Sequence, residues 1–286
     1  MGKYIVDLSK WNDKMKWPVA APQIELAICR VQYGSNLVDY LYSDHVANLE
    51  QYGIPHGAYA YGCFVSVTDA IVEAKDFMKR VSPNAKFLAL DVEKDTVASM
   101  KSKGNLRDLA KASQAFVDTC KAEGWKVGFY VSHELYNQHN LQNVQADFLW
   151  IPRYGTNDGT PQKKPNYVCD IWQYTDNAHI NGIGKVDINL LQGDKTLGWY
   201  IGEHHESLVP PSSSVAGKRV ESKVNNLRFY SKPSWANRDV VGTVNKGLGF
   251  IIDEKVMVNG STQYKVHNSK GATYYITASE KYVCVK

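Results

Sequence analysis

The chain has 286 residues, a length that corresponds to one large domain or two unequal ones. Hydrophobic residues make up 44% of it and charged residues 22%, so bulk disorder and a fibrous structure are excluded. The net charge of +4 is unevenly distributed, because residues 1–206 carry −3 and residues 207–286 carry +7, and the basic part favours a polyanionic partner such as nucleic acid, anionic lipid or an anionic cell-wall polymer.

Before residue 207, short apolar runs alternate with longer segments. Three of these segments have a helical pattern, at Tyr40–Tyr52, Asp69–Val81 and Leu106–Glu123. Strands that alternate with helices predict a parallel sheet, and eight strands in this length predict a closed (β/α)8-type barrel; a doubly wound open sheet is the competing fold. The eight predicted strands are Tyr4–Leu8, Ala27–Tyr33, Gly57–Val65, Phe87–Glu93, Val127–Ser132, Phe148–Tyr154, Ile171–Thr175 and Val186–Leu190.

The end of this first region differs from its beginning. Residues 155–169 and 176–184 are rich in Gly, Pro and Asn, which predicts loops. The last three strands of the barrel are therefore expected to lack full helices.

A change of composition divides the chain at residues 207–217, which hold two prolines, four serines and a glycine without any charge. This composition is typical of an exposed linker. We therefore predict domains at residues 1–206 and 218–286. In the second domain, short β-type runs separated by turn residues predict a small all-β barrel or sandwich; they are Asn225–Tyr230, Val240–Val244, Phe250–Val258, Gln263–His267 and Thr273–Thr277.

Targeting and redox signals are few. No apolar run approaches the ~18–20 residues of a membrane helix, so membrane insertion is not expected, and the N-terminus has no signal-peptide pattern. The five cysteines are widely spaced without a C-x-x-C, which argues against a disulfide framework or a thiolate zinc site and favours synthesis in a reducing cytosol.

The strongest chemical signal is the strand that ends in Asp91 and Glu93. Side chains alternate between the faces of a strand, so these two carboxyl groups point the same way from its carboxyl end. Their repulsion raises the pKa of one of them, which gives a protonated acid beside an ionised base. A solvated strand end is the alternative interpretation.

Two further carboxylates follow the same pattern. Asp7 ends the first predicted strand and Asp187 lies in the eighth. In a closed barrel these two strands are neighbours and the fourth faces them. Asp7, Asp91, Glu93 and Asp187 are therefore expected around one acidic pocket, although Asp7 alone is also compatible with a helix N-cap.

Aromatic and amide side chains are frequent at the same strand ends. Such rings suit sugars, and paired carboxylates are what glycoside hydrolysis requires, although for each ring by itself core packing is the favoured interpretation. The candidate substrate-binding residues are Tyr33, Tyr61, Tyr130, Trp150, Trp172 and Gln173, with Tyr59, Tyr154 and Tyr174 nearby.

Motifs for other chemistry are absent from the sequence. His133 and His139 are six residues apart, whereas the zinc-binding helix motif requires four. There is no nucleotide-binding glycine loop and no nucleic-acid-binding signature. We therefore predict no metal, no cofactor and no nucleic-acid partner.

An ordered set of motifs resembles the glycoside hydrolase family 25 muramidases, in particular the endolysins of phages that infect Bacillus-type hosts. The set is Ile5-Val-Asp7-Leu-Ser9-Lys-Trp11, Ala89-Leu-Asp91-Val-Glu93, Trp150-Ile-Pro-Arg-Tyr154, Ile171-Trp-Gln-Tyr174 and Lys185-Val-Asp187-Ile-Asn189. This resemblance implies a flattened, irregular barrel. One departure is Asn12-Asp13, where many members have Gln and Gly, which puts subsite contacts in question but not the acidic core. The C-terminal segment resembles bacterial SH3-like cell-wall-binding domains, in Leu227-Arg-Phe-Tyr-Ser, Val241-Gly-Thr-Val, Gly260-Ser-Thr-Gln-Tyr-Lys-Val and Thr273-Tyr-Tyr-Ile-Thr.

The resemblance also implies roles for the four carboxylates. Glu93 is the general acid/base, Asp91 assists at the anomeric centre, and Asp7 and Asp187 line the site and tune the other two. The implied reaction is hydrolysis of the β-1,4 bond between N-acetylmuramic acid and N-acetylglucosamine in peptidoglycan strands, with the C-terminal domain bound to a polymer or peptide of the Gram-positive wall. The implied location is the host cytoplasm until release, then the wall. The alternatives are a chitinase-like glycosidase and a non-catalytic wall-binding protein.

Overall fold

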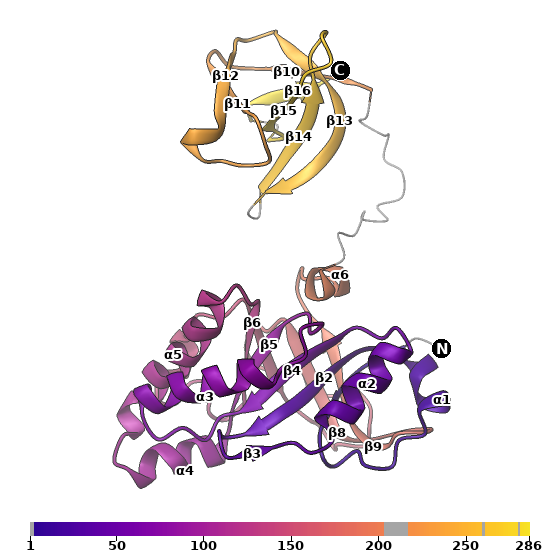
Figure 1. Ribbon diagram of the computed structural model, residues 1–286, viewed down its shortest axis with the longest axis vertical. Helices are drawn as coiled ribbons and strands as arrows, with labels where there is room; N and C mark the ends of the chain where they lie inside the picture. The colour runs from indigo at the N-terminus through magenta and orange to yellow at the C-terminus, as the bar shows by residue number, and fades with distance from the viewer. Residues whose placement is uncertain (1–2, 203–216, 259–260, 280) are drawn as a thin grey trace. The chain divides into compact units, whose positions relative to one another are not determined.

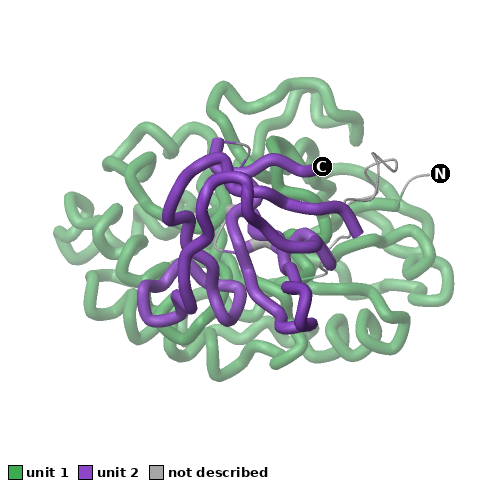
Figure 2. Tube along the Cα trace, turned by 90° about the horizontal axis from the view of Figure 1, so that it is seen from above, with its two compact units in different colours: residues 1–205 green, residues 206–286 purple. Residues whose placement is uncertain are grey.

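The computed structural model describes residues 3–202, 217–258, 261–279 and 281–286. The chain divides into two compact units, residues 1–205 and 206–286 (Figure 2). Nearly all of the predicted linker, residues 207–216, lies outside the described residues.

The first unit is a closed barrel, as the sequence predicts, and not an open sheet (Figure 1). It closes because β1 pairs with β2 on one side and with β9 on the other. A short strand, β3 (Leu37–Val38), extends β2 as an antiparallel partner. The eight barrel strands are β1 (Tyr4–Leu8), β2 (Ile24–Tyr33), β4 (His56–Tyr61), β5 (Leu88–Val92), β6 (Val127–Val131), β7 (Phe148–Pro152), β8 (Ile171–Ile180) and β9 (Gly184–Leu191).

Helices cover the strands of the first half of the barrel (Figure 1). The sequence-based prediction missed the helix that begins directly after Glu93, and its third helix begins with a 3₁₀ turn at Leu106–Asp108. None of the described helices is long and apolar enough to cross a membrane. The helices are α1 (Trp17–Ala20), α2 (Tyr42–Gln51), α3 (Val67–Arg80), α4 (Lys94–Ser102), α5 (Leu109–Ala122) and α6 (Leu197–Ile201).

The last two strands correct the expectation of an all-parallel barrel. β9 runs antiparallel to both β8 and β1. The segment 176–184, predicted as a loop, is largely the end of β8 and the turn that leads into β9. Gly182 has a φ of +85° there, which a glycine adopts at no steric cost. So short a connection permits only an antiparallel hairpin, because a parallel crossover needs a dozen or more residues. The predicted lack of helices is confirmed, since residues 153–170 contain none.

Alternation along the strands separates two apolar layers. In β5, Leu88, Leu90 and Val92 belong to the large core that includes α3 and α5, whereas Phe87 and Ala89 belong to the barrel interior. The interior is narrow, because a Cβ on Gly57 would lie 2.4 Å from the Phe87 ring and one on Gly128 would lie 2.1 Å from the Phe148 ring. Aromatic rings thus fill the barrel interior near the amino ends of the strands. Polar groups occupy the interior at the carboxyl ends.

The second unit is a seven-stranded sheet in the order β12-β11-β15-β14-β13-β10-β16, with every pair antiparallel. Its core contains Val220, Ile252, Val266 and Ile276. The sequence missed the first and last strands, which are short. The strands are β10 (Arg219–Ser222), β11 (Leu227–Tyr230), β12 (Val240–Val244), β13 (Gly249–Val258), β14 (Ser261–His267), β15 (Thr273–Thr277) and β16 (Val283–Val285).

Candidate active site

A cavity of about 180 Å³ lies at the carboxyl end of the barrel strands. It brings together all four carboxylates singled out in the sequence, although they lie up to 180 positions apart along the chain. The lining residues are Asp7, Tyr59, Asp91, Glu93, Tyr130, Trp150, Tyr154, Gln173, Asp176 and Asp187.

Strand register places the four carboxylates. Asp7 on β1 lies directly opposite Asp187 on β9. Asp91 on β5 is aligned with Tyr130 on β6 and faces the interior, in phase with Ala89. Glu93 follows β5 by one residue and keeps the same face. The geometry therefore follows from the two-residue period of the strands and from closure of the barrel.

A hydrogen-bond network holds Asp7 in position. Its carboxylate accepts from Asn189 Nδ2 at 2.8 Å and from Gln173 Nε2 at 3.1 and 3.2 Å. The Asn189 Oδ1 atom in turn accepts from the Trp150 indole at 2.7 Å. The Gln173 Oε1 atom accepts from the hydroxyls of Tyr130 and Tyr154, at 3.1 and 2.5 Å. These bonds hold the amide oxygens of Asn189 and Gln173 on the side away from Asp7. The NH₂ group of each amide therefore faces Asp7.

Burial raises the pKa of every one of the four carboxyl groups. The pKa of Glu93 is raised to about 7 by burial and by the charges of Asp95, Asp7 and Glu134, which together outweigh the lowering effect of Lys94. Burial and the charges of Glu93 and Asp7 hold the pKa of Asp91 well above its usual range. The pKa values of Asp7 and Asp187 are also raised, mainly by burial. The cluster therefore retains protons at a pH at which isolated carboxyl groups are ionised.

Glu93 and Asp91 differ in access to solvent. Asp91 is 5% exposed, and its Oδ1 atom has no hydrogen-bond partner among the described residues. Glu93 is half-buried. The Glu93 backbone N–H donates to Thr96 Oγ1 at 3.1 Å, and that hydroxyl donates to the Gly62 carbonyl at 2.6 Å. The start of α4 is thereby tied to the end of β4, which fixes the backbone that carries Glu93.

The predicted substrate-binding residues fall into three groups. Tyr130, Trp150 and Gln173 line the cavity. Tyr33 and Tyr61 do not line it; their rings stack at 4.6 Å, and the Tyr33 hydroxyl donates to Asp95 at 2.6 Å.

Trp172 is a correction. It is 2% exposed, packs in the outer core and donates its indole N–H to the Arg153 carbonyl at 2.8 Å. Its predicted place among the sugar contacts is wrong. The sequence already held this information. Trp172 and Gln173 are consecutive in a strand and point to opposite faces, so they could not both face the cavity.

Three lining residues were not among the predicted site residues. Tyr59 and Tyr154 had been noted only as strand-end aromatic residues. Asp176 reaches the cavity because the pairing of β8 with β9 shifts register between Thr175 and Ala178. A bulge of this kind interrupts the two-residue period, so no signal in the sequence identified Asp176. Among the described residues, no group of three or more His, Cys, Asp or Glu is arranged to hold a metal ion.

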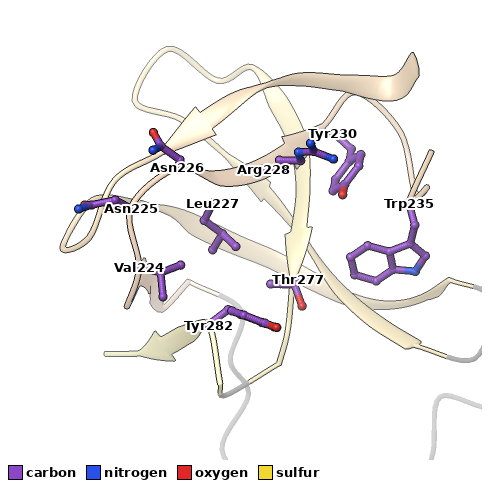
Figure 3. A pocket seen from close by; sticks show the side chains of 9 residues that line it. All are labelled: Val224, Asn225, Asn226, Leu227, Arg228, Tyr230, Trp235, Thr277 and Tyr282. Carbon is purple, nitrogen blue, oxygen red and sulfur yellow. The ribbon is translucent and has the colours of Figure 1, made fainter. Parts of the chain in front are cut away.

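A second candidate site is a hollow of about 370 Å³ in the C-terminal unit (Figure 3). Among the residues that the structure describes, no carboxylate lines it, and Arg228 is the one charged residue of the lining. The Trp235 indole donates to the Val258 carbonyl at 3.0 Å and packs edge-to-face on Tyr230. The lining residues are Val224, Asn225, Asn226, Leu227, Arg228, Tyr230, Trp235, Thr277 and Tyr282.

A neighbouring hollow of about 490 Å³ continues this surface. It shares Trp235, Thr277 and Tyr282 with the first and adds Lys255, and none of its described lining residues is a carboxylate. Neither Arg228 nor Lys255 forms an ion pair with a carboxylate of the described residues. The two hollows together form a cationic aromatic groove, the term used below for their combined lining.

The first unit is thus an α/β-barrel protein with a carboxylate-lined pocket at the strand ends where barrel enzymes assemble their sites. Comparison with known proteins defines it further. The chain belongs to the glycosyl hydrolases family 25, whose family model matches residues 6–183.

Solved structures show the same fold. The catalytic domain of endolysin ply40 from bacteriophage P40 of Listeria monocytogenes is 29% identical, with a TM-score of 0.62 over 68% of this chain and 95% of that one. The glycosyl hydrolase 25 GHIP of Streptococcus pneumoniae is 27% identical, with a TM-score of 0.60 over 66% of this chain and 87% of that one.

Two curated relatives match different lengths of the chain. The lysozyme of Streptococcus phage Cp-1 is 30% identical over 153 residues, half of this chain and 43% of the phage protein. The N-acetylmuramoyl-L-alanine amidase BlyA of Bacillus subtilis (strain 168) is 66% identical over 74 residues, 26% of this chain and 20% of that protein. The chain thus spans less than half the length of the curated relatives it matches.

Proposed function

We propose that the protein is a muramidase, which hydrolyses the β-1,4 bond between N-acetylmuramic acid and N-acetylglucosamine in bacterial peptidoglycan. The observation that carries this proposal is the buried cluster of four carboxylates, in which Glu93 has a pKa of about 7 and remains half-exposed to the cavity. Membership of a glycosyl hydrolase family supports the reaction type, and the name of the Cp-1 relative, lysozyme, supports the substrate.

Glu93 is the proposed general acid. Its carboxyl group holds a proton near neutral pH and is the most accessible of the pair at the end of β5, so it can donate to the glycosidic oxygen of a sugar in the cavity. The same group, once ionised, can accept a proton from the attacking water in the second half of the reaction.

Asp91 is the proposed partner at the anomeric centre. Its unpartnered Oδ1 atom is a free acceptor, and a developing oxocarbenium charge stabilises the ionised form of this buried carboxyl group. Two routes fit this position: direct attack on the anomeric carbon, and orientation of the substrate's own N-acetyl group as nucleophile. Trapping of a covalent glycosyl-enzyme distinguishes the first route from the second.

Asp7 and Asp187 are proposed to tune the pair. The charge of Asp7 raises the pKa of both Asp91 and Glu93. Asp187 lies across from Asp7, and the charge of Asp7 raises the pKa of Asp187 as well. Two further carboxyl groups in one cavity thus favour retention of the proton on Glu93.

We also propose that the C-terminal unit is an SH3-like domain that anchors the enzyme to the Gram-positive wall through the cationic aromatic groove. The +7 charge of residues 207–286 favours anionic wall polymers or peptides. The 74-residue match to a B. subtilis wall amidase has the length of this unit rather than of the barrel, which supports a shared wall-binding segment and a Bacillus-type host. A linked binder raises the local concentration of the catalyst at its substrate.

The biological setting that we propose is phage lysis. A chain of this kind accumulates in the host cytoplasm, is released at the end of infection and then acts on the wall. The named endolysin ply40 supports this assignment.

Analysis of the products of digestion tests the proposed bond. Purified Gram-positive peptidoglycan is digested by the full chain, reduced with borohydride and analysed by mass spectrometry. New reducing ends on muramic acid are the expected result. New ends on glucosamine indicate a glucosaminidase, free stem peptides indicate an amidase, and absence of soluble products indicates a non-catalytic wall-binding protein. Release of chitooligosaccharides from chitin in a parallel digest indicates a chitinase-like enzyme.

A further inference from the structure

The acidic cavity supplies little binding surface for a polymer. At about 180 Å³ it is smaller than the ~300–1,000 Å³ of typical small-molecule pockets. Three of its four rings are closed in by neighbours, since Tyr59, Tyr130 and Trp150 are 9%, 6% and 1% exposed, while the fourth, Tyr154, is half-buried. These rings therefore shape the cavity but offer little face on which a sugar can stack. Binding of a long glycan strand must use surface outside the cavity.

Exposed apolar side chains gather on two loops at the same end of the barrel. We call them the rim platform: Trp11, Leu37, Val38 and Tyr40, which are 77%, 57%, 49% and 68% exposed. Trp11 lies in the loop that leaves β1, and the other three lie in and after β3, in the loop that leaves β2. Since β1 and β2 are parallel neighbours, both loops leave the carboxyl end of the barrel, where the cavity opens.

A buried carboxylate holds these two loops together. Asp39 is 6% exposed and accepts from the Lys10 backbone N–H at 2.9 Å and from the Leu41 backbone N–H at 3.1 Å. Trp11 directly follows Lys10, and Tyr40 directly follows Asp39. The bond between Lys10 and Asp39 therefore lies next to both rings. The Lys10 amine also lies 4.9 Å from the centre of the Trp11 ring, which favours a fixed setting of that ring.

The same carboxylate connects the platform to the cavity. Asp39 accepts from Arg30 Nε at 2.9 Å, and the side chains of both are nearly buried. The positive charge of Arg30 lowers the pKa of Asp91 in the cavity, against the raising effect of burial. On the other side, β3 pairs Leu37 with Tyr33, whose hydroxyl bonds Asp95 two residues beyond Glu93. The platform thus shares β1 with Asp7 and is linked through Tyr33 and Asp95 to the segment that carries Glu93.

We propose that the rim platform is a distal sugar subsite, where rings of the glycan strand stack beyond the cleavage point. This inference rests on the proposed function and specifies how the same site selects a polymer. A glycan is the occupant that fits, because sugar rings have apolar faces that suit exposed aromatic rings and because the strand must leave the cavity across its rim. The exposed side chains of the platform lie together on two loops that a hydrogen bond joins, and are not scattered single residues.

The test compares long and short substrates. The full chain is assayed on peptide-free glycan strands of about ten or more disaccharides and on a tetrasaccharide, which has far fewer sugar rings available outside the cavity. In Trp11→Ala and Tyr40→Ala, we expect kcat/KM on long strands to fall about tenfold relative to the tetrasaccharide, mainly through KM, which is the scale of one well-packed aromatic contact. Trp11→Phe, which keeps a ring, is expected to restore most of this preference.

Tyr52→Ala is the matched control. Tyr52 is also an exposed tyrosine, at 41%, but it directly follows α2 at the opposite end of the barrel. It is expected to leave the preference for long strands as in the wild type. If Trp11→Ala and Tyr40→Ala leave the ratio of kcat/KM on long strands to kcat/KM on the tetrasaccharide unaltered, the proposed platform subsite alone is overturned. If the wild-type chain cleaves neither substrate, the proposed muramidase function fails instead.

Discussion

In the first unit five carboxylates line one cavity, whereas the groove of the second unit combines aromatic rings with cations and has no carboxylate among the described residues. Burial raises the pKa of Asp7, Asp91, Glu93 and Asp187. Arg228 and Lys255, by contrast, are exposed.

This difference separates what suits chemistry from what suits binding. Crowding like charges in a buried cavity costs stability, but it yields a proton donor near neutral pH. Exposed cations beside rings cost little, because water solvates them until a ligand replaces it. The four predictions below examine this contrast in order of decreasing effect.

Removal of the proposed acid has the largest expected effect. Glu93→Gln keeps the size of the side chain but has no proton to donate, so hydrolysis of purified walls is expected to fall roughly 10²–10⁴-fold. Wall binding is expected to match the wild type, because the groove of the second unit is untouched. Turbidity loss and a pull-down assay on the same walls measure the two properties. Lysis at the wild-type rate by Glu93→Gln would contradict the assignment.

The stability of the first unit is expected to depend on pH through Glu93. Its pKa rises from 4.5 to about 7 on folding, so the folded state holds a proton that the unfolded chain releases between these values. Stability is therefore lost as the pH rises through this window, and the loss reaches about 3 kcal/mol above pH 7. Urea unfolding of wild type and Glu93→Gln at pH 4 and pH 8 measures it. The advantage of the variant should be near zero at pH 4 and largest at pH 8; an equal difference at both would show that Glu93 titrates normally.

A charge change in the groove comes next. Arg228→Ala is expected to weaken binding to purified walls about tenfold, since a desolvated Arg–anion contact is worth roughly 1.5–3 kcal/mol at most. Within the described part of the chain, the substitution removes one side-chain hydrogen bond, from Arg228 Nη1 to Asn237 Oδ1 at 2.9 Å. Lys270→Ala, in the exposed turn after β14, removes the same charge outside the groove and serves as the control. Both are measured in the Glu93→Gln background, so that the walls stay intact. Equal binding by the two variants would rule out the groove as the site.

Salt is expected to have the smallest effect and to act on one unit only. Raising NaCl from about 0.1 to 0.5 M shortens the Debye length to less than half, so wall binding through exposed cations should weaken a few-fold. The kcat/KM on short soluble glycan fragments should change less, because buried charges are screened little. A sedimentation assay and a reducing-sugar assay over the same salt series provide the comparison. Loss of fragment hydrolysis in parallel with wall binding would contradict the separation of roles.

Local pattern was sufficient for much of the fold. The two-residue alternation in Phe87–Glu93 identified which face of β5 carries Asp91 and Glu93, and that face is the barrel interior. The apolar runs likewise indicated the eight strands. These features depend only on neighbours in the chain, and for that reason they can be read from one sequence.

Closure of the barrel decided the rest. The antiparallel direction of β9, the register shift that carries Asp176 into the cavity and the ties from Gln173 and Asn189 to Asp7 all depend on residues distant in sequence. Trp150 shows the same limit: its residue type indicated a sugar contact, but only packing showed that its face is covered and that its indole orients Asn189. The sequence by itself thus determined which groups point inward, because side-chain direction is a local property. Tertiary structure alone decided how deeply they are buried and which partners they meet, because burial and pairing are properties of the whole barrel.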